Sequence, residues 1–316
     1  MKKVIFPFLA ALSIFFLSCN NGDSGKTFTI KPKLKAGDLY SLECRVDINY
    51  KFSSGSGADA VRMDNDLMVA MGFLMKIKEI TPEQDINMNL MYKRIAMTMN
   101  SPAGSYSYDS NNPYENEDRG GFAGTMEKAL RASFSGLLNK SMQVSLDKDG
   151  KVKKVTGFKE IVQSIRDSAK GKLVNTETME KNMGEKQVNQ LFDQTFGVFP
   201  KKPVSVGDTW EVVFSQDMEG VPLKSTSTLR LVQVSDNKKE AVINVNSKLS
   251  SSGTSTKDAV KIDMYGTQTG TLIVDLVTGV FKHGTLTQDL KANMMIGREK
   301  VPLTVHTVTR LKGRKF

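Results

Sequence analysis

The sequence contains very little cysteine and histidine. Its 316 residues include two cysteines, two histidines and one tryptophan. Cys19 and Cys44 are too few for a disulfide framework, so packing and hydrogen bonding must hold the fold together. His283 and His306 lie in strand-like stretches, and neither is near a cluster of acidic or cysteine residues with metal-ligand spacing. The sequence therefore predicts no metal site.

Common catalytic motifs are absent as well. There is no G-x-S-x-G, H-E-x-x-H or P-loop pattern, and the 34 acidic residues are scattered along the chain. We predict no cofactor and no enzymatic activity; a hydrolase with an unrecognised site is the least favoured alternative.

The chain has a basic excess, with 44 lysine and arginine residues and a net charge of +10. These residues are spread thinly and form no basic block with interleaved aromatic residues, so nucleic acid is not an expected partner. A hydrophobic content of 39% with 16 phenylalanines is enough for a sizeable core.

Residues 1–18 have the pattern of an export signal. Lys2 and Lys3 precede an uncharged run from Val4 to Leu17. This run is too short to cross a bilayer as a helix, which takes about 20 apolar residues. We therefore expect residues 1–18 to be a signal peptide.

Cys19 follows the apolar run and precedes a polar stretch. The arrangement resembles the lipobox of bacterial lipoproteins, although Phe16 and Leu17 depart from its usual residues. The resemblance implies a lipid on Cys19, a flexible tether over residues 19–26 and anchoring in a membrane. Because Asn20 is not aspartate, it also implies the outer membrane, facing the periplasm. An ordinary secretory signal with an incidental cysteine is the alternative.

Alternating apolar and polar residues predict that strands dominate the rest of the chain. Between Tyr40 and Tyr50, for example, Cys44 shares one face with apolar residues while charged residues occupy the other. This pattern predicts a buried, structural thiol at Cys44. In contrast, residues 101–121 are polar and predict a mobile loop.

Two sequence markers occur twice. Gly37-Asp38 and Gly207-Asp208 each open a strand that begins with an aromatic residue, and turn glycines at Gly150 and Gly279 each separate two strand-like runs. The markers predict two related β-rich halves, residues 27–156 and 204–316. Chance matches in a β-rich protein are the alternative.

Helical periodicity appears at residues 125–138, 157–169 and 185–196, and Phe199-Pro200 ends the last stretch. Residues 157–203 are thus a predicted helical connector. The expected fold class is α+β: two related antiparallel halves, arranged as a curved sheet, a sandwich or a half-barrel, with helices from the connector packed against them.

These features together resemble a family of uncharacterised lipoproteins of Gram-negative bacteria. The resemblance rests on Cys19, the paired Gly-Asp strand openings, the exit at Phe199-Pro200 and the glycine-threonine run from Gly266 to Gly279. It covers most of the chain after Cys19. It implies a domain of unknown function and assigns no activity and no site residue.

Methionine is concentrated in one region, because eight of the 17 methionines fall between Met63 and Met99. Methionine suits adaptable apolar surfaces. One hypothesis is therefore an apolar groove lined by Met71, Met75, Met88 and Leu90; ordinary core packing is the alternative.

Two functions follow from the sequence. The first is a non-enzymatic binding or interaction protein of the cell envelope that docks a protein partner. The second is a carrier or sensor of a hydrophobic or envelope-derived ligand.

Overall fold

The computed structural model describes residues 25–54, 61–102, 104–113, 120–169, 184–218, 221–254, 261–296 and 299–316. The predicted signal peptide, Cys19 and most of the predicted tether lie outside the described residues. Twelve strands and three helices are found within these ranges. The strands are β1 (Leu39–Ser54), β2 (Val61–Ile80), β3 (Ile86–Ser101), β4 (Gly104–Asp109), β5 (Ser141–Leu146), β6 (Val152–Thr156), β7 (Thr209–Met218), β8 (Val221–Val234), β9 (Glu240–Thr254), β10 (Lys261–Asp275), β11 (Val280–Ile296) and β12 (Glu299–Lys315). The helices are α1 (Gly121–Ser135), α2 (Phe158–Ala169) and α4 (Glu185–Phe196).

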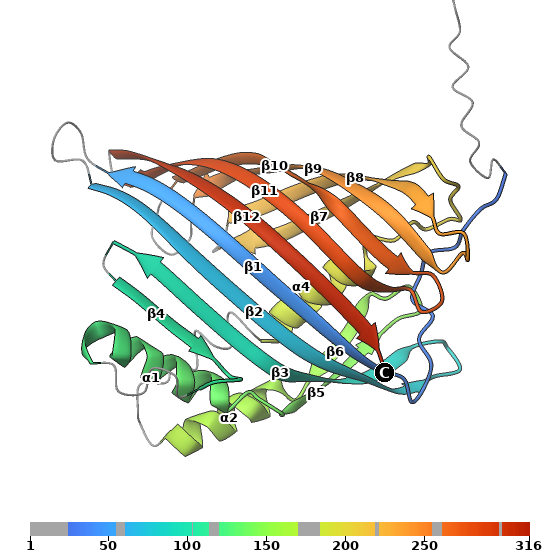
Figure 1. The fold of residues 1–316 in the computed structure, drawn as a ribbon, viewed down its shortest axis with the longest axis horizontal. Helices are drawn as coiled ribbons and strands as arrows, with labels where there is room; N and C mark the ends of the chain where they lie inside the picture. Colours follow the sequence, from blue (N-terminus) through green and yellow to red (C-terminus); the bar gives the residue numbers. More distant parts are fainter. Residues whose placement is uncertain are drawn as a thin grey trace, which may run out of the picture.

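All of these strands belong to one antiparallel sheet. Its order is β6-β5-β3-β2-β1-β12-β11-β10-β9-β8-β7, and the short strand β4 pairs with the second part of β3. The first long strand, β1, therefore pairs directly with the last one, β12. Figure 1 shows that the sheet is strongly curved and that α4 lies on its hollow side. The predicted antiparallel, β-rich fold is confirmed, with few helices, and of the three arrangements that the sequence left open the described strands form the curved sheet. The duplication of two halves stays a prediction.

The two faces of β1 differ sharply in polarity. We call the face that carries Leu42, Cys44 and Val46 the inner face, because Leu42 packs against the main core. Side chains alternate along a strand, so Glu43 and Arg45 lie on the outer face. The alternation predicted for this segment is thus the arrangement that β1 adopts.

One core joins the strands at both ends of the sheet order. It includes Leu90 of β3, Leu229 of β8 and buried residues of α2 and α4 such as Phe158 and Phe192, all 1% exposed or less. The helical periodicity in the sequence places these phenylalanines on the buried sides of their helices. Because the core is continuous, the two predicted halves do not have separate interiors.

The chain before β1 crosses one end of the sheet and closes it. The amide of Phe28 donates to the carbonyl of Val204 at 2.8 Å, and the amide of Lys33 donates to the carbonyl of Thr278 at 2.8 Å. Gly279, in the turn between β10 and β11, has φ +71°, and a Cβ there would lie 1.9 Å from the carbonyl oxygen of Lys31. This close approach requires glycine.

The prediction of a mobile loop at residues 101–121 is partly wrong. Its Gly104–Asp109 segment forms β4, whose alternating residues pair with β3. The alternation of apolar and polar residues did not predict this strand, because its residues are mostly small and polar and a short edge strand needs few apolar residues. Among the described residues, no helix is long and apolar enough to cross a membrane.

Candidate functional site

A cavity of about 270 Å³ lies on the inner face of the sheet. Its walls come from α4, from the segment that follows α4, and from the strands β1 and β7 to β12. The lining is mainly leucine, valine and phenylalanine, with Leu191, Phe214, Leu229, Leu272, Leu286 and Leu311 among them. This volume is just below the range of about 300–1,000 Å³ that is usual for small-molecule sites.

The roof of the cavity is held in place by two hydrogen bonds at the end of α4. The amide of Gly197 donates to the carbonyl of Asp193 at 2.8 Å and ends the helix. The indole nitrogen of Trp210, on β7, donates to the carbonyl of Val198 at 2.8 Å. Val198 and Phe214 both line the cavity. The link from Trp210 therefore ties the segment after α4 to the edge strand beside it.

A row of polar, uncharged side chains crosses the inner face at the cavity. The strand register places Ser227 opposite Ser247, Ser247 opposite Gln268, and Gln268 opposite Gln288. The two serine hydroxyls lie 2.8 Å apart. The amide nitrogen Nε2 of Gln268 lies 3.5 Å from Oε1 of Gln288, at the outer limit of a hydrogen bond. We call these four residues the polar row.

Cys44 also lines the cavity, opposite Met71 and Leu311 in the strand register. Burial raises the pKa of its thiol from 9.0 to about 11. The thiol is therefore protonated at neutral pH and behaves as a small apolar side chain. The alternation placed Cys44 on the correct face of β1, but the residue is half-buried beside the cavity and not fully buried as predicted.

The four residues of the predicted methionine groove lie away from this cavity. Met75 and Leu90 are fully buried and Met88 is 1% exposed, all three within the main core, while Met71 is half-buried against it. None of the four lines the cavity on the inner face. Met75, Met88 and Leu90 thus pack in the core, whereas the cavity is bordered by α4, β1 and the strands β7 to β12.

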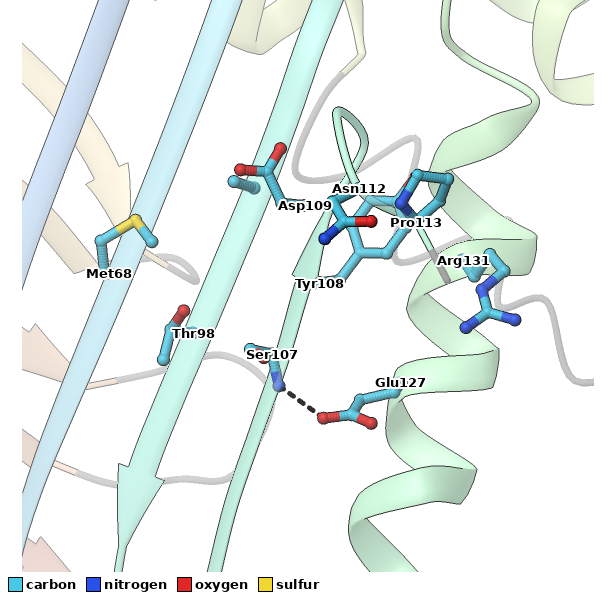
Figure 2. A pocket seen from close by; sticks show the side chains of 10 residues that line it. Met68, Thr98, Ser107, Tyr108, Asp109, Asn112, Pro113, Glu127 and Arg131 are labelled. Carbon is cyan, nitrogen blue, oxygen red and sulfur yellow. Dashed lines mark hydrogen bonds between the residues drawn. The ribbon is translucent and has the colours of Figure 1, made fainter. Parts of the chain in front are cut away.

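A second, smaller hollow of about 180 Å³ lies between α1 and β4 (Figure 2). Glu127 points from α1 toward the strand, is 2% exposed, and accepts a hydrogen bond of 2.9 Å from the amide of Ser107. Arg94 and Asp109 form an ion pair of 2.6 Å on the neighbouring strands. Because α1 covers the free edge of β4, Glu127 satisfies a backbone donor that an exposed edge would leave open. The contact between α1 and β4 therefore covers and stabilises the edge of the sheet.

Neither histidine contributes to these hollows. His306 pairs with Asp289 at 2.7 Å, and both side chains are at least half-exposed. In the part of the chain that the structure describes, no group of three or more histidine, cysteine, aspartate or glutamate residues is placed to hold a metal ion.

Sequence reasoning missed the cavity and its polar row. The signal that could have found them was a break in the apolar alternation of β8, where Ser225 and Ser227 stand at inner-face positions between Leu223 and Leu229. Gln268 and Gln288 interrupt β10 and β11 in the same way. A single strand cannot show that these interruptions fall in one row, because only the register of neighbouring strands brings them together.

A family model matches residues 83–281, more than half of the chain, and its description is a family of unknown function, DUF6263. The chain belongs to this family. No curated protein matches it.

Solved structures give weak likenesses. A structure described as lipid-protein interactions in lipovitellin has a TM-score of 0.46 and 9% identity, covering 89% of this chain and 25% of that one. The chain therefore spans about a quarter of the lipovitellin chain. An outer membrane channel from Pseudomonas putida F1 has a TM-score of 0.22 and 6% identity, covering 90% and 97% of the two chains. OmpF of Salmonella typhi in complex with daunomycin has a TM-score of 0.20 and 7% identity, covering 86% and 98%. None of these likenesses assigns a function to this chain.

Proposed function

We propose that this member of DUF6263 is a non-enzymatic, lipid-anchored protein of the cell envelope that binds a hydrophobic molecule on the inner face of its sheet. The observation that carries the proposal is the cavity of about 270 Å³, with its lining of leucine, valine and phenylalanine. A cavity with such walls favours apolar ligands, because each methylene that leaves water contributes about 0.8 kcal/mol.

Docking of a protein partner is less well supported by the described surface. Its large exposed apolar side chains, such as Phe122, Val213, Tyr265 and Val277, belong to different elements. Single exposed apolar residues are common on protein surfaces and do not mark an interface. The cavity therefore favours the ligand-binding hypothesis over the docking hypothesis.

Fluorescence of a neutral apolar probe, N-phenyl-1-naphthylamine, tests this proposal. The purified protein is titrated with the probe and compared with two variants of the same strand, Thr309→Phe and Thr304→Phe. Thr309 lines the cavity, whereas Thr304 is exposed on the outer face. We expect Thr309→Phe to weaken probe binding about tenfold or more, because the ring occupies the cavity, and Thr304→Phe to leave it unchanged. Equal binding by both variants would exclude the cavity as the site.

The anchor is tested separately through Cys19, which lies outside the described residues. Acyl chains on Cys19 would hold the protein on a membrane, at about 0.8 kcal/mol per buried methylene. We expect Cys19→Ala to release or mislocalise the protein while its circular dichroism spectrum is retained. Full labelling of that variant by palmitate in growing cells would contradict the assignment of the anchor.

A further inference from the structure

We propose that the ligand is an uncharged amphiphile, an apolar chain that carries a hydroxyl, ester or amide group, and that Gln268 and Gln288 hold this group where they face each other across β10 and β11. This inference rests on the proposed function, and it names the class of molecule that the cavity accepts.

The described residues that line the cavity carry no charge. The polar side chains of the lining are Thr195, Ser225, Ser227, Gln268, Gln288 and Thr309. Lysine and arginine, which pair with carboxylate and phosphate groups, are not among the lining residues. Transferring an ionised head group into such a site without a cation would cost far more free energy than burying a neutral polar group.

The charges of the neighbouring strands lie on the other face. On β1, Glu43, Arg45 and Asp47 alternate with the inner-face residues Cys44 and Val46. Asp47 is already paired with Arg45 and with Arg310 of β12. A strand cannot turn one of these side chains to the inner face without a shift of register, so the outer-face cations are not available to a ligand in the cavity.

The two pairs of the polar row differ in their hydrogen bonding. Ser227 and Ser247 are 5% and 0% exposed and satisfy each other at 2.8 Å. Gln268 and Gln288 are half-buried, and their contact of 3.5 Å uses one donor and one acceptor at the limit of bonding. Each glutamine amide offers two donors and one carbonyl acceptor. The glutamine pair therefore retains capacity for a ligand group, which the serine pair largely lacks.

Apolar side chains lie on both sides of the glutamine pair. Gly266 and Gly270 stand on either side of Gln268 on the inner face of β10. A Cβ at these positions would lie 2.6 Å from Cδ2 of Leu290 and 2.8 Å from Cδ2 of Leu286, respectively. The glycines thus leave room for these two leucines of β11 beside the glutamine; Leu286 lines the cavity, and Leu290 belongs to the apolar cluster that also contains the lining residue Leu249. The glutamine pair is thus a polar site with apolar side chains on either side. This arrangement matches an apolar chain that carries one polar group.

Competition with matched ligands tests the inference. 1-Decanol and sodium decanoate have the same chain length and differ at the head group, which is ionised in decanoate at pH 8. Each is used to displace N-phenyl-1-naphthylamine from the purified protein. We expect decanol to bind at least about tenfold more tightly than decanoate, since an unpaired buried carboxylate is penalised. Equal or tighter binding of decanoate would overturn the inference.

Variants of the glutamine pair complete the test. Gln268→Met and Gln288→Met keep the length of the side chain and remove its amide. We expect each to weaken decanol binding about fivefold to tenfold, the effect of one lost hydrogen bond. Decanol binding should fall relative to binding of the probe by the same variant, a comparison that corrects for any change in the packing of the cavity. The control is Gln233→Met, at an exposed position of β8, which should leave both ligands unaffected.

The outcomes separate the two proposals. If the probe binds in the cavity but decanol binding is unchanged in both methionine variants, this inference is wrong and the proposed function stands. If Thr309→Phe does not weaken probe binding, or if no probe binds, the proposed function fails and the inference fails with it.

Discussion

The hydroxyl groups of Ser227 and Ser247 face each other across β8 and β9 at 2.8 Å, and both residues are almost completely buried. They lie on the inner face, between the core at one end of the sheet and the smaller cluster around Leu249 and Leu290 at the other. Two buried hydroxyls in an apolar surrounding are tolerated because each satisfies the other.

Removing one member of this pair should therefore be worse than removing both. We expect Ser247→Ala to lower the free energy of unfolding by about 1–3 kcal/mol, because the hydroxyl of Ser227 loses its main partner. The double variant Ser227→Ala/Ser247→Ala should recover part of that loss. Urea denaturation of the four proteins in this mutant cycle measures both effects. A double variant whose loss equals the sum of the single losses would show that the hydroxyls act independently.

The thiol of Cys44 should react with alkylating reagents only at high pH. Burial raises its pKa to about 11, and the thiolate is the reactive form. We expect its alkylation by iodoacetamide to accelerate about tenfold per pH unit beyond pH 9 and to level off only near pH 11. Between pH 9 and 11 the thiol ionises in the unfolded protein but stays protonated in the folded one. The raised pKa therefore also predicts that the free energy of unfolding falls as the pH rises through this range. Peptide mass spectrometry follows Cys44 separately from Cys19, and a plateau near pH 9 would mean that water reaches the thiol freely.

Much of the fold could be predicted from the sequence, because its helices and turns depend on patterns of residues that are close together in the chain. The three predicted helices correspond to α1, α2 and α4. The predicted turn at Gly150 joins β5 to β6, and its glycine has φ +85°. The paired Gly-Asp markers also share one geometry. Asp38 accepts a hydrogen bond from the amide of Lys35, and Asp208 accepts one from the amide of Ser205. Short-range hydrogen bonds of this kind depend on adjacent residues alone, so their signal survives in a single sequence.

The site depended on long-range register, which no local pattern contains. The sequence drew attention to Met75 and Met88, yet both lie in the closed core. Equally apolar strands of the second half border the cavity because α4 leaves space beside Leu272 and Leu286. Whether an apolar inner-face residue meets a helix or a cavity is decided by the placement of α4, and periodicity does not encode that placement.

Glu127 should be required for α1 to stay on the edge of β4. Its carboxylate accepts the amide of Ser107 at 2.9 Å (Figure 2). We expect Glu127→Ala to lower the free energy of unfolding by about 1–3 kcal/mol, because a backbone donor loses its acceptor. Hydrogen exchange at Ser107 should accelerate at the same time. Lys128→Ala, at the exposed neighbouring position on the helix, is the control and should change neither quantity. Unchanged exchange at Ser107 in Glu127→Ala would show that the contact does not protect the strand edge.

Gly279 should be the least replaceable turn glycine, because two separate penalties coincide there. Its φ of +71° disfavours any L side chain, and a Cβ would collide with the carbonyl of Lys31 at 1.9 Å. Gly207 is a matched control, with φ +100° and no atom within 4 Å of the point where a Cβ would lie. We expect Gly207→Ala to cost about 1–2 kcal/mol, the strain of the left-handed backbone alone. Gly279→Ala should cost at least about 3 kcal/mol, because the segment that closes this end of the sheet must also move. Thermal and urea unfolding of both variants provide the comparison. If both variants lose the same free energy of unfolding, the segment around Lys31 moves without an energetic penalty and does not stabilise the end of the sheet.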